Sequence, residues 1–110
     1  HGMQHAVFSD RVADADRGRH FSRMQPESQR AVFDLSWPQH FFIGHADGVP
    51  VLVMGGEKDA FFPPSMIEST ARIYGVTPET FPEMGHAMML EPDWQLAADR
   101  IIGWLKGIGL

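Results

Sequence analysis

The run VPVLVM at residues 49–54 is the feature that most restricts how this chain can fold. It is continuously apolar and rich in β-branched side chains, and it does not alternate between apolar and polar residues. A strand of this kind is covered on both faces, as in a parallel sheet with helices on either side. The pair Gly55 and Gly56 that follows is expected to end the strand. We therefore predict an α/β fold around a buried parallel strand.

A helix and a second strand are predicted to follow this run. The proline pair at residues 63–64 opens a helix over residues 65–74, and Gly75 stands where a residue in the left-handed conformation closes a helix. The second strand covers residues 76–81, but Pro78 leaves only its last three residues free to pair. A strand–helix–strand unit implies parallel pairing through a right-handed crossover.

Three more helices are predicted outside this unit. The whole chain then has the order helix, helix, strand, helix, strand, helix. Residues 10–24 have weak helical character, and Pro26 is well placed to open a helix over residues 27–35. Residues 39–48 are expected to form a loop or a short extended piece. A final helix begins at Pro92. Its apolar stripe, near the 3.6-residue period, consists of Trp94, Ala97, Ala98, Ile101, Leu105 and Ile108.

Two strands alone do not make a stable sheet. A two-stranded sheet is marginal in water, and its apolar faces and open edges need cover. The 110 residues are enough for one small domain with a limited core. We therefore expect the chain to be incomplete as an independent domain, with further strands supplied by a missing N-terminal part, by another chain or by domain swapping.

The composition excludes several classes of protein. A formal net charge of -5 argues against a nucleic-acid partner, because neutralising phosphates needs a basic surface. The absence of cysteine excludes disulfides and thiolate metal sites. No apolar run approaches the roughly 20 residues that span a bilayer, so we expect no membrane partner. The starting residues HGMQH do not resemble a signal peptide, and the cytoplasm is the expected location.

Asp59 and His86 come directly after the two predicted strands, and their placement carries the functional prediction. Ligands and catalytic groups collect at the carboxyl ends of strands in an open parallel sheet. Neighbouring strands lie about 4.8 Å apart, so the two loops can bring a carboxylate against an imidazole. Such a carboxylate fixes the tautomer through one ring nitrogen, and the other nitrogen accepts a proton from a nucleophile.

The sequence from VPVLVMGGEKDAFFPPSM to TFPEMGHAMMLEPDWQLAADRIIGWL, within residues 49–106, resembles the last third of an α/β-hydrolase-fold enzyme. Residues 9–36 resemble, more weakly, the end of the cap region that such enzymes insert over their active site. The resemblance implies that residues 1–48 are the end of the cap and a connecting loop, and that residues 49–110 are the C-terminal part of the hydrolase core. It also implies that Asp59 is the triad acid and His86 the triad histidine.

The nucleophile of such a triad is not found in this sequence. In the family it stands in a G-x-S-x-G turn and precedes the acid and the histidine. None of the six serines has glycine two positions away on both sides: Ser9, Ser22, Ser28, Ser36, Ser65 and Ser69. The resemblance thus implies a serine-type hydrolase of ester, thioester or related acyl bonds, without metal or organic cofactor, whose nucleophile lies outside this chain. The 110 residues alone are expected to be inactive.

Two other functions stay open. The chain is compatible with a non-catalytic, hydrolase-derived module that dimerises through its exposed strands. It is also compatible with a dehalogenase, an epoxide hydrolase, a cofactorless haloperoxidase or a C–C hydrolase, since these share the acid and the histidine and fold alone does not set the reaction. The upstream sequence, with its nucleophile, would decide among the chemistries.

Each candidate side chain also has a purely structural interpretation. Asp59 alone could be a solvated turn residue, and His86 alone a surface histidine. Packing is the favoured role for the Phe61–Phe62 pair, and Glu57 and Glu91 are expected to be solvated. Met84, Met88 and Met89 fit an acyl-sized pocket or the core equally well. The remaining histidines do not match a zinc-binding spacing: His1, His5, His20, His40 and His45.

Overall fold

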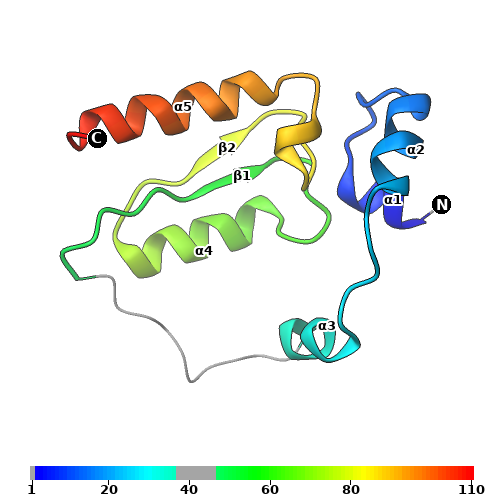
Figure 1. Cartoon of the computed structure of the whole chain (residues 1–110). Helices are drawn as coiled ribbons and strands as arrows, with labels where there is room; N and C mark the ends of the chain where they lie inside the picture. Colours follow the sequence, from blue (N-terminus) through cyan, green and yellow to red (C-terminus); the bar gives the residue numbers. More distant parts are fainter. Residues whose placement is uncertain (1, 37–46) are drawn as a thin grey trace.

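The structure is a computed structural model that describes residues 2–36 and 47–110. Its elements are, in order, α1 (Gly2–Val7), α2 (Asp14–Ser22), α3 (Gln29–Ser36), β1 (Met54–Gly56), α4 (Pro64–Tyr74), β2 (Glu79–Phe81), the 3₁₀ helix η1 (Met88–Leu90) and α5 (Trp94–Gly107) (Figure 1). The chain therefore has an α/β architecture, with a small parallel sheet and helices around it.

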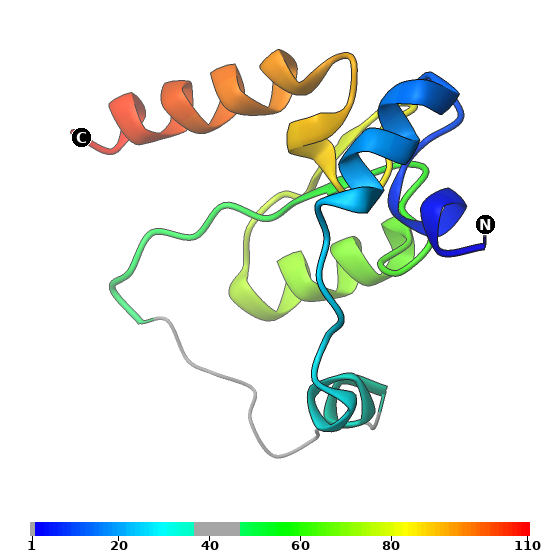
Figure 2. The ribbon, with the colours of Figure 1, turned by 45° about the vertical axis from the view of Figure 1, so that its right-hand side comes forward.

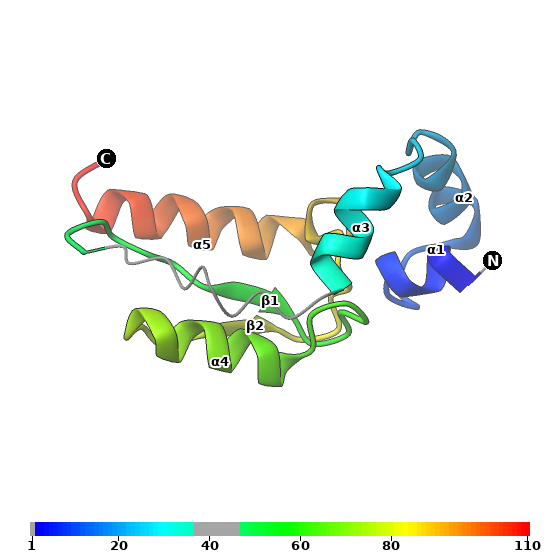
Figure 3. The same ribbon diagram turned by 90° about the horizontal axis from the view of Figure 1, so that it is seen from below.

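The sheet consists of β1 and β2, which pair in parallel with Met54 opposite Glu79 and Gly56 opposite Phe81. Helix α4 connects the two strands. In all three ribbon views the strands lie between α4 and α5 (Figure 1, Figure 2 and Figure 3). The predicted strand–helix–strand unit with parallel pairing is confirmed.

The predicted position of the first strand is wrong by several residues. We expected a strand over residues 49–54 that the glycine pair would end, but β1 begins at Met54 and includes both glycines. The cause lies in the partner strand. Pro78 has no amide hydrogen, so pairing starts where the amide of Glu79 donates to the carbonyl of Val53, at 3.0 Å. The apolar residues before Met54 have no partner strand within the described residues.

Helix α4 and strand β2 begin and end close to where proline and glycine predict, whereas α5 does not begin at Pro92. Helix α4 starts at Pro64, one residue before the predicted start, and ends at Tyr74, which is followed by Gly75 with a φ of 66°. The amide of Gly75 donates to the carbonyls of the last turn, as a left-handed closing residue does. Strand β2 covers only the three residues after Pro78, as predicted. Helix α5 starts two residues after Pro92.

The N-terminal part of the chain packs on the loop that follows β2. Helix α1 was not predicted, and α2 covers only the middle of the weak helix predicted over residues 10–24. The described core cluster consists of Val7, Phe8, Val12 and Ala87, with Phe21 and Leu90 packed against it. Helices α1 and α2 thus lie beside the carboxyl ends of the strands (Figure 1).

The molecule exposes more surface than a compact protein of its size. Its accessible area is 8300 Å², whereas a compact monomer of this length exposes about 6,100 Å². The radius of gyration is 15.5 Å, against about 13 Å for a compact domain of 110 residues. The α5 stripe is only partly covered: Ala97 is buried, but Trp94 and Ile101 are 46% and 42% exposed.

Some predictions concern residues that the structure does not describe. The loop expected over residues 39–48 lies outside the described residues except for Asp47 and Gly48, which form part of a turn. The histidines at positions 1, 40 and 45 lie outside them as well. None of the helices in residues 2–36 and 47–110 has the length and apolar content that crossing a membrane requires.

Candidate functional site

Asp59 and His86 are hydrogen-bonded to each other, as their positions after the two strands predicted. His86 Nδ1 lies 3.0 Å from Asp59 Oδ2, and because a carboxylate oxygen can only accept, the ring nitrogen is the donor. The Asp59 side chain is 7% exposed and that of His86 is 41% exposed. The pair therefore has a buried carboxylate end and an imidazole that reaches the surface.

The Asp59 carboxylate is held in place by the backbone that follows it. Its Oδ1 accepts hydrogen bonds from the amides of Phe61 and Phe62, at 2.8 and 2.9 Å. An aspartate side chain that binds the amides two and three residues ahead stabilises a tight turn. This arrangement occupies one carboxylate oxygen and leaves Oδ2 directed at His86.

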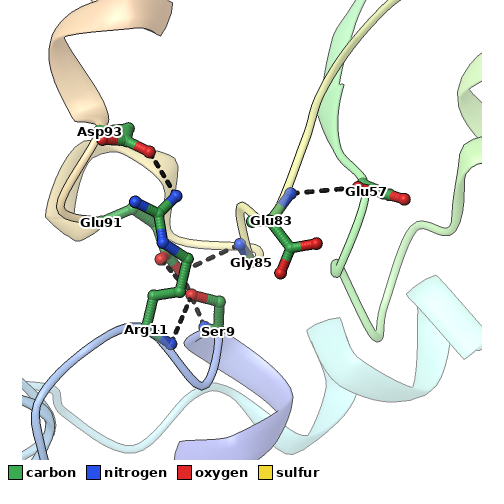
Figure 4. A network of polar contacts seen from close by, with 7 residues as sticks. All are labelled: Ser9, Arg11, Glu57, Glu83, Gly85, Glu91 and Asp93. Atoms are coloured by element: carbon green, nitrogen blue, oxygen red, sulfur yellow. Dashed lines mark hydrogen bonds and ion pairs between the residues drawn. The ribbon is translucent and has the colours of Figure 1, made fainter.

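Backbone hydrogen bonds join the loop after β1 to the loop after β2. The amide of Glu57 donates to the carbonyl of Phe81 at 2.9 Å, and the amide of Lys58 donates to that of Met84 at 2.8 Å. The amide of Glu83 returns a bond to the Glu57 carboxylate at 3.1 Å (Figure 4). The bond from Glu57 to Phe81 extends the parallel pairing by one residue past β1. Together the three bonds fix the distance between the loops that carry Asp59 and His86.

Gly56 is needed for the close approach of these loops. A Cβ atom at this position would lie 2.4 Å from the carbonyl oxygen of Met84 and 2.7 Å from that of Gly85. Both contacts are with backbone atoms, which cannot rotate away as a side chain can. Glycine therefore lets the loop after β1 lie directly against the residues that precede His86.

Two phenylalanines flank the imidazole of His86. The ring centroids of Phe61 and Phe62 lie 5.0 and 5.6 Å from that of His86, at interplanar angles of 61° and 34°. Both residues are 43% exposed. They pack against the imidazole and restrict its orientation. The packing role predicted for this pair is therefore found next to His86.

The second ring nitrogen of His86 is the chemically available one. Among residues 2–36 and 47–110, Asp59 is the only hydrogen-bond partner of the His86 side chain. No serine or threonine hydroxyl in the same ranges bonds to it, and the Ser9 hydroxyl is buried against Glu91. The pair can therefore accept a proton at Nε2 from a group that approaches from outside the described residues.

Glu91 is buried, and the expectation that it is solvated is wrong. It is 2% exposed, and its carboxylate accepts three hydrogen bonds, from the amide of Ser9, the hydroxyl of Ser9 and the amide of Gly85 (Figure 4). At the edge of this network, Arg11 forms an ion pair with Asp93. The hydrogen bond from this guanidinium to Asp93 and the charge of that carboxylate raise the pKa of Arg11 above its ordinary value.

Met84 is 1% exposed and belongs to the interior, whereas Met89 is 70% exposed. No group of three or more metal-binding side chains is found among the described residues. A surface pocket of about 200 Å³ lies next to the loops of the site, and neither Asp59 nor His86 lines it. Its lining residues are His5, Phe8, Ser9, Asp10, Lys58 and Glu83.

The sequence predicted that Asp59 and His86 lie close together, but it did not predict the burial of Glu91. No periodicity or motif singles out Glu91, because its burial depends on contacts with Ser9, which is 82 residues away in the sequence. No protein-family model, no curated protein and no solved structure matches the chain.

Proposed function

We propose that this chain is the C-terminal part of an α/β-hydrolase and supplies the acid and the histidine of its catalytic triad. The observation that carries the proposal is the hydrogen bond of 3.0 Å between His86 Nδ1 and Asp59 Oδ2, at the carboxyl ends of two parallel strands. A buried carboxylate that fixes one ring nitrogen, with the other nitrogen accessible, is the arrangement that activates a nucleophile for acyl transfer.

The reaction we propose is hydrolysis of an ester, a thioester or a related acyl bond. A serine hydroxyl supplied from outside these 110 residues would attack the acyl carbon while His86 Nε2 takes its proton. His86 would then give that proton to the leaving group, and water would release the acyl group from the serine. No metal or organic cofactor takes part in the proposed steps.

The large exposed surface supports the part of the proposal that concerns the missing strands. An accessible area of 8300 Å² exceeds that of a compact monomer by about 2,200 Å². Strand β1 pairs on one side only among the described residues. Further strands of the same sheet would cover both the open edge and part of this area.

A fluorophosphonate probe tests the proposal on the full-length protein. We expect covalent labelling of one serine outside the 110 residues, because an activated serine attacks phosphorus as it attacks an acyl carbon. The heat-denatured protein serves as the control and is expected to stay unlabelled, as is the 110-residue chain by itself. Absence of labelling in the native full-length protein would contradict a serine nucleophile and favour the other chemistries of this fold.

A non-catalytic module that dimerises is the second candidate, and the same open strand edge favours it. Two copies could join their sheets through β1 and bury the excess surface between them. Sedimentation of the full-length protein, with the labelling experiment, separates the two candidates. An unlabelled dimer supports the module, whereas a labelled protein of any oligomeric state supports the hydrolase.

A further inference from the structure

We propose that Glu91 is a positioning residue that sets the place of His86 through the backbone of Gly85. This role rests on the proposed function, and it concerns a residue that does not touch His86 itself. Glu91 Oε1 accepts the amide of Gly85 at 2.9 Å and the amide of Ser9 at 2.8 Å. Its Oε2 accepts the hydroxyl of Ser9 at 2.5 Å. One carboxylate thus joins the residue before His86 to the N-terminal segment (Figure 4).

The backbone on both sides of His86 is fixed to the same N-terminal segment. On one side Gly85 is held through Glu91, and on the other the amide of Ala87 donates to the carbonyl of Val7 at 3.0 Å. The contact at Gly85 is tight. A Cβ atom there would lie 2.7 Å from Glu91 Oε1 and 2.7 Å from the amide nitrogen of Ser9. The position of His86 therefore depends on where residues 7–9 lie.

A buried carboxylate is well suited to this task because it accepts bonds from several directions. Burying a carboxylate is unfavourable unless its oxygens are hydrogen-bonded, and here both oxygens have donors. Amide donors to a carboxylate make shorter and stronger bonds than donors to a neutral acceptor. An apolar side chain would fill the same space, but it would leave the amides of Ser9 and Gly85 buried without partners.

Three variants of Glu91 distinguish a positioning role from simple packing, because they keep or remove different hydrogen bonds of its carboxylate. In Glu91→Gln, Oε1 still accepts both amides, and the new amide nitrogen can donate to the Ser9 hydroxyl. In Glu91→Ala all three bonds are lost. In Glu91→Asp the carboxylate is drawn back by about one bond length, 1.5 Å, so it cannot reach Ser9 and Gly85 together. Glutamine therefore conserves the placement of Gly85, and the two shorter side chains do not.

Steady-state hydrolysis of a p-nitrophenyl ester by the full-length protein gives the first readout. We expect Glu91→Asp and Glu91→Ala to lower kcat by about 10- to 100-fold, because a displaced general base loses its alignment with the nucleophile. KM is expected to change less than about threefold, since Glu91 is 2% exposed and is not available to touch a substrate. Glu91→Gln is expected to retain kcat within about fivefold, as the conservative variant of a positioning residue. Glu68→Ala on the exposed surface of α4 is the matched control.

The NMR signal of the proton on His86 Nδ1 gives a second readout that does not depend on activity. We expect this signal to persist in Glu91→Gln and to shift or broaden in Glu91→Asp, while circular dichroism shows both proteins folded. If Glu91→Ala does not fold, the aspartate variant decides. A wild-type protein with neither esterase activity nor fluorophosphonate labelling would overturn the proposed hydrolase, and the His86 signal alone would then test the positioning role. A folded Glu91→Asp protein with the wild-type signal would overturn the role of Glu91, whatever its activity.

Discussion

Asp59→Asn in the full-length protein is expected to lower kcat for ester hydrolysis by on the order of 10³- to 10⁴-fold, with KM nearly unchanged. Asparagine can still accept the amides of Phe61 and Phe62 through its oxygen, so the turn around residue 59 is expected to remain. Its amide nitrogen would replace Oδ2 opposite His86 Nδ1. Because two donors cannot bond to each other, the ring proton moves to Nε2, and the nitrogen that must accept a proton is then occupied.

His86→Ala provides the companion measurement and Asp16→Asn the control. Removing the imidazole abolishes the proton acceptor, so we expect a loss at least as large as that of Asp59→Asn. Asp16 is an aspartate on α2 that pairs with Arg19 at the surface, and Asp16→Asn is expected to leave kcat within about twofold. A decrease of less than tenfold for Asp59→Asn, measured with initial rates at neutral pH, would show that Asp59 does not orient a catalytic histidine.

Gly56→Ala is expected to destabilise the folded protein by about 2–3 kcal/mol. The added methyl group would meet the carbonyl oxygens of Met84 and Gly85 at 2.4 and 2.7 Å, and neither can move without its backbone. The loops after β1 and β2 would have to separate, which lengthens the bond from Lys58 to Met84 and draws His86 away from Asp59. Chemical denaturation measures the change in the free energy of unfolding, and the ester assay measures the accompanying loss of kcat.

Gly103→Ala is the matched control for this substitution. Gly103 lies within α5, and a Cβ atom there would have nothing within 4 Å. Alanine in the interior of a helix is more favourable than glycine by about 0.5–1 kcal/mol, so the control is expected to be slightly more stable than the wild type. Equal unfolding midpoints for the two variants would show that the approach of the two loops does not need a glycine at position 56.

Several single residues determine the local structure as predicted, whereas Pro26 and Pro92 lie three and two residues before the helices that they were expected to open. Pro64 and Gly75 fix the two ends of α4, and Pro78 fixes the start of β2, because each restricts the backbone or its hydrogen bonding by itself. Asp59 and His86 were predicted as a pair for a related reason, since the ends of parallel strands meet at one edge of a sheet. The hydrogen bond between them is in the structure.

Features that depend on distant parts of the chain were not predicted. The start of β1 depends on where its partner strand can first donate an amide, so the apolar run at residues 49–54 did not indicate it. The burial of Glu91 depends on Ser9, which is 82 residues away in the sequence. Helix α1 is six residues long and gains its place from contacts of Val7 and Phe8 with the loop after β2.

Both halves of the chain contribute to the arrangement of the candidate site. Residues 49–110 provide Asp59 and His86. Residues 7–9 bond to Glu91 and to the backbone of Ala87, and in this way they hold the loop that carries His86. In the proposed hydrolase, the end of a cap region would thus help to place the catalytic histidine as well as cover it. Changes in residues 7–9 are therefore expected to affect kcat through the placement of His86.

Nitrogen NMR of the His86 ring in the full-length protein tests the central claim most directly. At neutral pH we predict that Nδ1 carries the proton and gives a slowly exchanging signal through its bond to Asp59, while Nε2 is unprotonated. In Asp59→Asn the proton is predicted to move to Nε2 and the slow signal to disappear. A wild-type ring protonated mainly at Nε2, or a ring whose spectrum does not change in Asp59→Asn, would contradict the account.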